Sequence, residues 1–554
     1  MSRPRVAVAV AVALLSFWTA EARAQEVLIE ADASPHPPDT RTRKVHGDIR
    51  FGAGFGFIVE DPIASLEPSF GLDFRDIAPV ELRIGAPIRL RMYDRDPEQG
   101  PVIRNTDWDE VGDYLAILQQ LSYAGDYVFA EQGRAMVDLR VGSLGRVHVG
   151  HGSIVHGYAN SLDLDRRRTG VDLDARVEGA LLEQTAGAEL AFVVGDLAGQ
   201  QIFGTRLGAD WAGAGIGLSV FGDPFAPRTL VPAGSAALQV DSQNRLAATG
   251  TRGATALGLD FSYRWTDRWR YLVVPYIDLN LMPGLGKGMH IGVDTEFTLG
   301  RRRAVRLGVV GELTVGDRGY DPTYFDVFYM SQRMQGQFLA YPGDLPSDFA
   351  GTAAPKYGFV QQNDLHGVGG HGAVRFSHEE GAFIETGYRY RPGPLGHTWE
   401  TRVGVDLEVV QLSVLAAHKG PFGFNIVDPA GTVARLDLNV PVNSYLDVTA
   451  QAGWQPVVRR APGEPATARQ PSGGFVGGGG LILVPALFAV FPATHPATLF
   501  GINKGASVWG TAVATSQYAR RVDLRWSALL PAATAGMPAD QPAHPTSCRE
   551  WRCC

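Results

Sequence analysis

Two things are scarce in this chain: cysteine, and long apolar runs beyond the first residues. The three cysteines, Cys548, Cys553 and Cys554, all lie at the very end of the 554-residue sequence. The body of the chain is therefore not held together by disulfides. After residue 24 no stretch reaches the 18 or more apolar residues that a membrane-spanning helix needs. The best candidate, Leu481–Phe491, is short and interrupted by Pro485, so helical membrane spans are not expected.

Lysine is also scarce, because nearly all the basic residues are arginine. The formal net charge is −8 and the isoelectric point is about 5.9. An acidic chain of this kind argues against nucleic acid as a partner. Phosphate-binding loops and dinucleotide fingerprints are missing as well, so no cofactor is expected.

The amino terminus has the pattern of a secretory signal peptide. Arg3 and Arg5 form a basic start, the apolar run Val6–Phe17 follows, and Ala22-Arg23-Ala24 is a small-x-small cleavage site. We expect residues 1–24 to be removed and the mature chain to begin with a short segment, 25–45. An uncleaved anchor helix is the alternative interpretation.

The segment Met289–Leu299 shows the dominant pattern of the chain. Its odd positions are mostly apolar, and its even positions include His290, Asp294 and Glu296. Such alternation predicts a strand with one apolar face and one ionisable face. After the turn Gly300–Arg303, the same alternation resumes from residue 305 to residue 315.

Similar alternation recurs from residue 46 to about residue 484. It is clearest in residues 49–57, 82–92, 137–141, 171–177, 257–265, 269–279, 399–407 and 446–454. A face this rich in ions cannot pack as a dry core, because unpaired buried charges are too costly. If the charged face lines water, the apolar face meets lipid and the sheet closes on itself, no charge is buried and no edge is left open.

The sequence therefore predicts an all-β fold, a closed antiparallel transmembrane β-barrel of residues 46–484, with about 18 strands and an acceptable range of 16 to 20. Short turns are expected to alternate with longer connections near 153–169, 222–252, 317–371 and 418–431. Because antiparallel strands alternate in direction, successive connections fall at alternate ends of the barrel. Counted in this way, the long connection at residues 93–112 falls at the end where short turns are expected, which indicates a missed strand before residue 135. Residues 485–554 form an atypical Pro- and Ala-rich tail.

These features together resemble Gram-negative outer-membrane porins and related substrate channels. The resemblance covers residues 46–484 and is one of architecture, so it assigns no subfamily. It implies an integral protein of the cell outer membrane, with short periplasmic turns, long outer loops, and a monomeric or homotrimeric state. Its implied partners are outer-membrane lipid, lipopolysaccharide, the barrel assembly machinery and small polar solutes. The chain departs from that group by ending in SCREWRCC instead of an aromatic-terminated strand; either the barrel closes near Gly473–Val484, or the carboxyl terminus is atypical.

A charged stretch in one long connection is the candidate pore constriction. In porins a loop folds into the lumen, and opposed charges on it filter solutes. The resemblance implies this role for Asp163, Asp165, Arg166, Arg167 and Arg168; a solvated surface loop is the alternative. Strand parity predicts the charged side chains of the lumen wall: Arg83, Arg89, Arg91, Arg140, Arg146, Arg176, Asp294, Glu296, Arg306 and Glu312.

Whether the chain is an enzyme is left open by one short motif. His151 and Ser153 form a His-x-Ser step like that of outer-membrane phospholipases, where histidine acts as the base for a serine nucleophile. Parity with Val147 and Val149 predicts that both side chains point to lipid. The Asn-Gly that follows in that family is missing here, so a structural strand end is the alternative.

Metal binding is not expected. His151 is at an odd position and His148 and His156 are at even positions, so on a strand they would lie on opposite faces. In addition, no carboxylate completes a ligand set. The pair Asp163-x-Asp165 lacks the glycine and the distal glutamate of a calcium loop.

The function that fits best is an outer-membrane channel for passive diffusion of small polar or charged solutes, because barrels of 16 to 18 strands leave an aqueous channel. Only residues 25–45 precede the barrel, which argues against a large energy-coupled receptor. A lipid-acting hydrolase at His151 and Ser153 and a non-conducting surface or adhesion barrel remain the alternatives.

Overall fold

The fold is described from a computed structural model of the chain. It describes residues 45–58, 61–75, 78–92, 103–104, 107–129, 133–162, 167–181, 184–199, 201–231, 238–239, 247–267, 271–299, 304–340, 355–362, 364–379, 381–393, 396–407, 409–420, 431–443, 446–460 and 468–483. The predicted signal peptide (1–24), the segment 25–45 except Val45, and the tail 485–554 lie outside the described residues.

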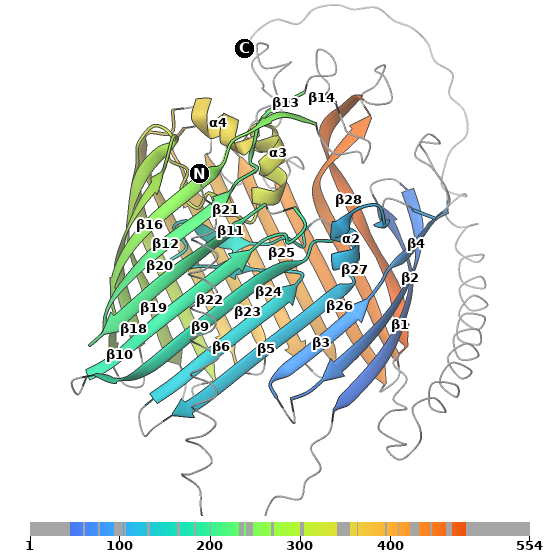
Figure 1. The fold of residues 1–554 in the computed structure, drawn as a ribbon, viewed down its shortest axis with the longest axis horizontal. Helices are drawn as coiled ribbons and strands as arrows, with labels where there is room; N and C mark the ends of the chain where they lie inside the picture. Colours follow the sequence, from blue (N-terminus) through green and yellow to red (C-terminus); the bar gives the residue numbers. More distant parts are fainter. Residues whose placement is uncertain are drawn as a thin grey trace, which may run out of the picture. The chain divides into compact units, whose positions relative to one another are not determined.

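The described strands form a closed barrel wall (Figure 1). The wall strands are β1 (His46–Ile58), β2 (Asp61–Asp73), β3 (Val80–Gly85), β4 (Ile88–Arg91), β5 (Leu118–Phe129), β6 (Gly133–Gly142), β9 (Gly170–Leu181), β10 (Gln184–Val194), β11 (Phe203–Trp211), β12 (Ala214–Asp223), β16 (Ala254–Tyr263), β17 (Trp265–Asp267), β18 (Tyr271–Met282), β19 (Gly286–Leu299), β20 (Val305–Gly316), β22 (Gly367–His378), β23 (Ala382–Tyr390), β24 (His397–Leu407), β25 (Val410–Gly420), β26 (Thr432–Asn443), β27 (Leu446–Arg460) and β28 (Ala468–Leu483). Neighbouring wall strands pair antiparallel throughout.

The wall closes where β1 pairs with β28, Phe51 lying opposite Leu483 and Ile58 opposite Val476. β3 and β4 both pair with β2, and β16 and β17 both pair with β18, so each couple is one interrupted wall strand. The described wall therefore has 20 strands. The prediction of about 18 strands is wrong in number, and the closed antiparallel barrel is confirmed.

One missed strand is β2, which lies between the predicted strands 49–57 and 82–92. Its inner positions include Ser65, Glu67 and Ser69, so only one of these three is charged and the alternation is weak. Once β2 is added, the long connection at 93–112 falls on the same side as the other long connections. This resolves the parity conflict that the sequence showed before residue 135.

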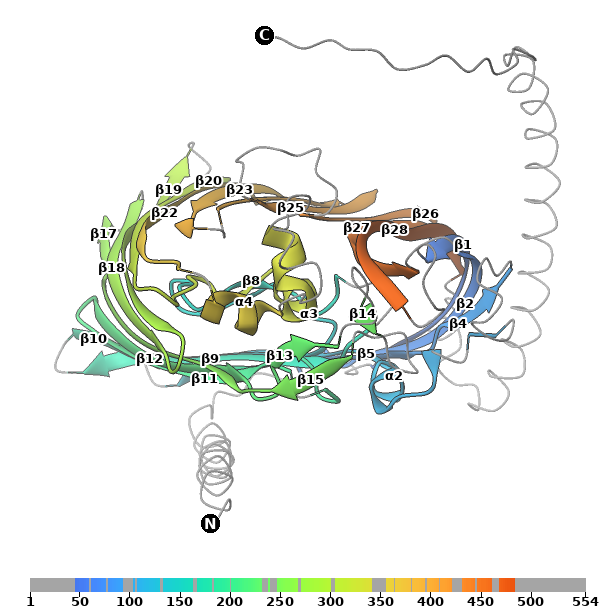
Figure 2. The same cartoon turned by 90° about the horizontal axis from the view of Figure 1, so that it is seen from above.

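Shorter elements lie in the connections. They are β7 (Val147–His148), β8 (Val155–Tyr158), β13 (Pro227–Leu230), β14 (Leu238–Gln239), β15 (Ala248–Thr251), β21 (Phe325–Asp326), α2 (Val111–Leu115), α3 (Tyr329–Ala340) and α4 (Lys356–Gln362). β7, β8 and β21 form a separate three-stranded sheet. Seen from above, α3, α4 and β8 lie within the ring of wall strands (Figure 2). None of the helices in the described ranges is long and apolar enough to cross a membrane.

The two ends of the barrel differ. At one end, which we call the short-turn end, β9 stops at Leu181 and β10 starts at Gln184, and β11 stops at Trp211 and β12 starts at Ala214. At the other end, which we call the loop end, much longer stretches join β6 to β9, β12 to β16 and β20 to β22. Which end faces the periplasm stays a prediction.

The outer face of the wall is apolar and uncovered. Along β19, Ile291 is 48% exposed and Val293 is 40% exposed, whereas His290, which points inward, is fully buried. The same outward exposure recurs around the described wall, at Phe55, Leu207, Leu218, Ile277, Leu279, Leu313, Val374 and Phe376 among others. Period-two alternation thus produces an apolar outside and a polar inside, as the sequence predicts.

Glycines form the inner face at the closure of the wall. A Cβ at Gly56 would lie 2.4 Å from the carbonyl oxygen of Gly477, and one at Gly478 would lie 2.3 Å from that of Phe55. Figure 2 shows β1 at a strongly curved end of the flattened ring. Glycine is required on the inside of so tight a bend because side chains there would collide with the neighbouring backbone.

Candidate functional site

The lumen is partly filled by two connections that fold inward. The first inward segment consists of the described residues 143–162 and 167–169 and contains β7 and β8. The second consists of the described residues 317–340, 355–362 and 364–366 and contains β21, α3 and α4. The chain turns inward at Gly142, the last residue of β6, which has a φ of +136°. A Cβ there would lie 2.4 Å from the carbonyl oxygen of Gln119, so glycine suits this turn.

Arginines and a glutamate of the wall hold the first inward segment in place. Arg402 of β24 donates hydrogen bonds to the carbonyl oxygens of Gly157 (3.1 Å) and Gly145 (3.4 Å). Arg146 within the segment forms an ion pair of 2.5 Å with Glu385 of β23. Charged groups of the inner wall therefore bind backbone carbonyls of the segment as well as one another.

Apolar side chains of both inward segments form a dry core with the loop end of the wall. Val149 and Val155 of the first segment and Phe325 of the second are buried there. The wall contributes Val193 of β10 and Phe221 of β12 to the same cluster. At this end the inner positions of the wall are apolar and pack against the inward segments instead of carrying the charges that the sequence shows elsewhere.

Of the predicted constriction residues, two are described. Arg167 forms an ion pair of 3.3 Å with Glu67 of β2. Arg168 donates a hydrogen bond to Gln201 and contacts the sulfur of Met330 at 3.6 Å. Asp163, Asp165 and Arg166 lie outside the described residues. The described arginines thus lie inside the lumen, and their role in a constriction stays a prediction.

The predicted lumen-wall residues lie on wall strands, except Arg146, which belongs to the first inward segment. The set is Arg83, Arg89, Arg91, Arg140, Arg176, Asp294, Glu296, Arg306 and Glu312. Arg83 and Arg89 line one cavity of the lumen and Arg176 lines another, and the part of the set in lining a channel stays a prediction. Several are paired along the wall: Arg176 with Glu178 (2.7 Å) and Asp210 (3.3 Å), and Arg140 with Asp138 (2.7 Å). Opposite charges within one strand, or two strands apart on the same face, offset one another, which keeps so many ions compatible with one face.

Glu312 is the most deeply buried of these predicted groups, with a side chain only 1% exposed. It accepts hydrogen bonds from the hydroxyl of Tyr276 and from Arg389, both at 2.9 Å, and His290 Nδ1 lies 3.0 Å away. Three donors around one carboxylate explain how a charge can be kept in this part of the lumen.

The predicted outward direction of His151 and Ser153 is wrong. Both residues follow the inward turn at Gly142 and lie within the lumen. His151 Nδ1 is 2.8 Å from Asp278 Oδ1 of β18, and its ring stacks on Tyr276 with centroids 4.1 Å apart. The Ser153 side chain is 8% exposed, and its carbonyl oxygen accepts a hydrogen bond from the backbone of Thr323. A lipid hydrolase facing the bilayer is thus not supported at this pair.

Three histidines meet where the first inward segment contacts the wall. The rings of His148 and His156 are 4.7 Å apart, and those of His156 and His371 of β22 are 5.4 Å apart. Burial lowers the pKa of His156 well below its usual range, and the neighbouring His148 adds to the shift, so the ring is neutral near pH 7. Within the described ranges no group of three or more His, Cys, Asp or Glu residues is placed to hold a metal ion.

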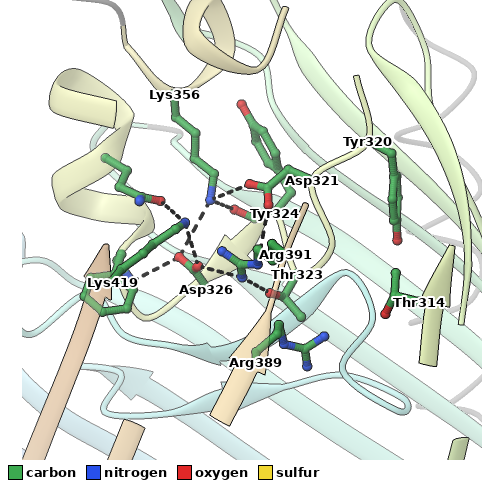
Figure 3. Close-up of polar contacts among 12 residues, drawn as sticks. Thr314, Tyr320, Asp321, Thr323, Tyr324, Asp326, Lys356, Arg389, Arg391 and Lys419 are labelled. Atoms are coloured by element: carbon green, nitrogen blue, oxygen red, sulfur yellow. Dashed lines mark hydrogen bonds and ion pairs between the residues drawn. The ribbon is translucent and has the colours of Figure 1, made fainter. Parts of the chain in front are cut away.

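A buried ion cluster anchors the second inward segment to the wall (Figure 3). Lys356 Nζ lies 3.2 Å from Asp321 Oδ2 and 3.7 Å from Asp326 Oδ1. From the wall side, Arg391, just after β23, and Lys419 of β25 approach Asp326 at 3.2 and 3.5 Å. Burial alone would raise the pKa of Asp326, but Lys356, Lys419 and Arg391 outweigh it and hold that pKa below its usual range.

A second anchor joins α3 to the end of β12. Asp223 is fully buried and accepts hydrogen bonds from Arg333 Nε (2.6 Å) and from the hydroxyl of Tyr329 (2.8 Å). Sequence reasoning missed both anchors because their partners are far apart in the chain. The signal that could have found them is the aromatic-rich run Tyr320–Tyr329, which is unusual for a solvated loop.

Two large cavities in the lumen are bordered by described residues. The larger, of about 780 Å³, borders β1, β2 and β25 to β28 and is called the seam cavity. Its lining runs along β1 from Arg50 to Ile58 and includes Asp406 and Gln411 at the short-turn end. The eight residue steps from Arg50 to Ile58 span roughly 26 Å along β1. With the strand tilted by about 40° from the barrel axis, the height of the cavity along that axis is about 20 Å.

The other cavity, of about 660 Å³, is called the blind cavity. It borders Gln184, Ala212 and Thr266 near the short-turn end and stops against Gly150 and His151 of the first inward segment. The dry core of the two inward segments lies on the loop side of these residues. The seam cavity thus extends along most of the wall, whereas the blind cavity is closed on one side.

The charged side chains of the seam cavity are unevenly placed. Arg50, Arg83 and Arg89 of β1, β3 and β4 line one side, together with Arg167. The facing side, on β24 to β27, has two carboxylates, Asp406 and Asp437, among uncharged polar groups: Gln411, Ser413, Asn439, Thr449 and Gln451. The arginines have carboxylate partners, such as Asp48 for Arg83 at 3.3 Å. The arrangement places donors that suit anionic and hydroxylated solutes along one path.

No protein-family model matches the chain, and no curated protein matches it. Among solved structures, it is similar to a mutant ferric enterobactin receptor from Pseudomonas aeruginosa, with 8% identity over 80% of this chain and 82% of that chain and a TM-score of 0.35. It is also similar to a mutant porin from Rh. blastica, with 7% identity over 80% of this chain and 100% of that chain and a TM-score of 0.24. The strand pairing of this chain itself confirms the closed barrel that the predicted resemblance implies, and no subfamily is assigned.

Proposed function

We propose that this protein is an integral barrel of the Gram-negative outer membrane that lets small polar or charged solutes diffuse passively along the seam cavity. The observation that carries the proposal is the uncovered apolar outer face of a closed wall. Soluble proteins rarely expose contiguous apolar surface of this extent. A barrel that pairs every wall strand and presents apolar side chains outward meets the two demands of a bilayer.

The seam cavity supports a conduit because of its length and width. Its height of about 20 Å covers most of the apolar band of roughly 25 Å that outer-membrane barrels present to lipid. Spread over that height, 780 Å³ gives a mean cross-section of about 40 Å², the scale of a small organic solute. The arginine row facing amides and hydroxyls favours small carboxylates and hydroxylated solutes.

The two inward segments act as the filter in this proposal. Their described residues contact wall strands from β10 to β26 and leave the side next to β1 and β28 open. Arg167, which lines the seam cavity and pairs with Glu67, is where the first inward segment meets the conduit. In the outer membrane, lipopolysaccharide and the barrel assembly machinery are the expected partners, and the protein acts as a monomer or a homotrimer.

The test is solute efflux from proteoliposomes that contain the purified protein. We expect small hydroxylated carboxylates and monosaccharides to leave faster than from protein-free vesicles, and a folded protein cargo to be retained. Outer-membrane fractionation of expressing cells accompanies the assay. Efflux no faster than from empty vesicles would contradict the channel and leave a non-conducting barrel, whereas recovery in the soluble fraction would contradict the membrane location.

A further inference from the structure

The ion cluster that anchors the second inward segment has more positive than negative side chains. Lys356, Lys419 and Arg391 share two carboxylates, Asp321 and Asp326 (Figure 3). All five side chains are at most 5% exposed. An excess cation in so dry a place is costly unless an anion or further acceptors compensate it.

Arg391 shows where the compensation is missing. Its Nη2 donates hydrogen bonds to Thr323 Oγ1 (2.5 Å) and Asp326 Oδ2 (3.2 Å). Its Nε is 3.7 Å from Asp321 Oδ1, beyond hydrogen-bond distance. Among the described residues, neither Nε nor Nη1 has a hydrogen-bond partner, and both atoms are shielded from solvent. A guanidinium that is 1% exposed thus has unused donors.

A small cavity lies beside these donors. It measures about 30 Å³ and is lined by Arg391, Thr398 and His156 among others. Thr398 Oγ1 and His156 Nδ1 are likewise buried and without a hydrogen-bond partner in the described part of the chain. The arginine can only donate, the hydroxyl can donate, and a neutral histidine donates from Nδ1 in one tautomer.

The carboxylates that also line the cavity are already engaged. Glu400 accepts a hydrogen bond of 2.6 Å from Arg402, and Glu385 pairs with Arg146 at 2.5 Å. Asp326 is shared among the three cations of the cluster. The unused groups around the cavity are therefore those that can donate, with no unengaged carboxylate to attract a cation.

We propose that this cavity binds a monatomic anion of chloride size, held by Arg391, Thr398 and His156. The volume admits one or two water-sized occupants, which excludes a phosphate or a carboxylate with its substituents. In this proposal an anion in the cavity accepts from Arg391 and Thr398, lies beside His156 and offsets the excess positive charge, whereas a water molecule brings no charge. The bound anion would complete the anchor of the second inward segment, which makes the packing of that segment depend on halide.

The decisive test is a crystal of the full chain grown in sodium bromide. We expect an anomalous peak in the cavity within hydrogen-bond distance of Arg391 Nη1. Bromide peaks confined to exposed surface sites, with a water molecule in the cavity, would overturn the proposal. This experiment uses the unaltered protein, so it does not depend on any variant folding, and it is independent of whether the barrel conducts solutes.

A solution experiment uses a matched pair of threonine variants. Thr398→Val removes one donor to the anion, whereas Thr386→Val changes an exposed threonine of the neighbouring strand, which hydrogen-bonds to Thr401. At constant ionic strength, chloride replacing gluconate should raise the thermal midpoint of the wild-type protein. We expect Thr398→Val to weaken the apparent chloride affinity about tenfold, as the loss of one charge-assisted hydrogen bond would do, and Thr386→Val to leave it unchanged. Equal chloride responses in both variants would contradict the site.

Discussion

Asp326 is the carboxylate on which the anchor of the second inward segment depends most. In Asp326→Asn, Lys356, Lys419 and Arg391 keep only Asp321 as a counter-ion. Removing one partner of a buried ion pair costs about 3 to 5 kcal/mol. At about 1.4 kcal/mol for each factor of ten, the released form of the segment should become roughly 150 to 5,000 times more populated.

Limited trypsin digestion measures that population. The informative cleavage sites are Arg333 and Lys356. Their side chains are only 13% and 2% exposed while the segment is docked, so trypsin reaches them only after the segment is released. When opening and closing are fast relative to cleavage, the cleavage rate follows the population of the open form. The rate at which cut fragments appear from Asp326→Asn should therefore rise roughly 150- to 5,000-fold over wild type.

The matched control is Asp126→Asn. Asp126 pairs with Arg134 at 2.6 Å, but both side chains are about half exposed, at 52% and 50%. Exposed ion pairs contribute about 0 to 1 kcal/mol, so this change should alter the digestion rate by less than about fivefold. If Asp326→Asn were cut no faster than Asp126→Asn, the ion cluster would not hold the segment in the lumen.

The remaining predictions concern the closure of the wall, ion selectivity and acid. Gly56→Ala should cost about 1 to 3 kcal/mol and lower the temperature at which the heat-modifiable band is lost on gels, because its Cβ would lie 2.4 Å from a backbone oxygen; Gly311→Ala, with nothing within 4 Å, is the control. Arg83→Gln should shift the reversal potential in a salt gradient toward cation preference, whereas Arg140→Gln, which does not line the seam cavity, should leave it unchanged; equal shifts would argue against the conduit. Because the folded pKa of Asp326 is depressed, its stabilisation is present above the unfolded pKa of about 3.9 and is lost as the pH falls further. Hydrogen exchange in α3, corrected for intrinsic rates, should therefore rise below about pH 4, and protection that stays constant down to pH 2 would contradict this.

The wall was predictable from sequence because its physics is local and periodic. In β19, apolar and ionisable residues alternate without interruption, so one strand suffices to define an inside and an outside. β2 was missed because Ser65 and Ser69 are weaker markers of an inner face than arginine or aspartate. β2 accounts for one of the two strands that separate the predicted number of about 18 from the 20 of the described wall, and the fold is unchanged.

The interior was less predictable because it depends on contacts between distant parts of the chain. When the inward–outward alternation of β6 is extended along the chain, His151 is predicted to face lipid. The chain leaves the wall at the turn at Gly142, so the alternation does not continue beyond that residue. The pairing of Asp326 with Lys419 has no periodic signature. Loop length and charge did indicate an inward segment at Arg167 and Arg168, and the described part of that segment does lie in the lumen.

The central claim is that solutes pass along the seam cavity and not through the blind cavity. Two isosteric changes separate these paths: Ser413→Cys places a thiol in the seam cavity and Ser262→Cys places one in the blind cavity. Both would be made after Cys548, Cys553 and Cys554 are changed to serine, and single-channel current would be recorded in planar bilayers before and after adding a negatively charged thiol reagent. We expect discrete current steps that shrink on modification of Ser413→Cys and stay unchanged for Ser262→Cys. Block only at Ser262→Cys would contradict the path, and a folded barrel that carries no current in any variant would contradict the channel.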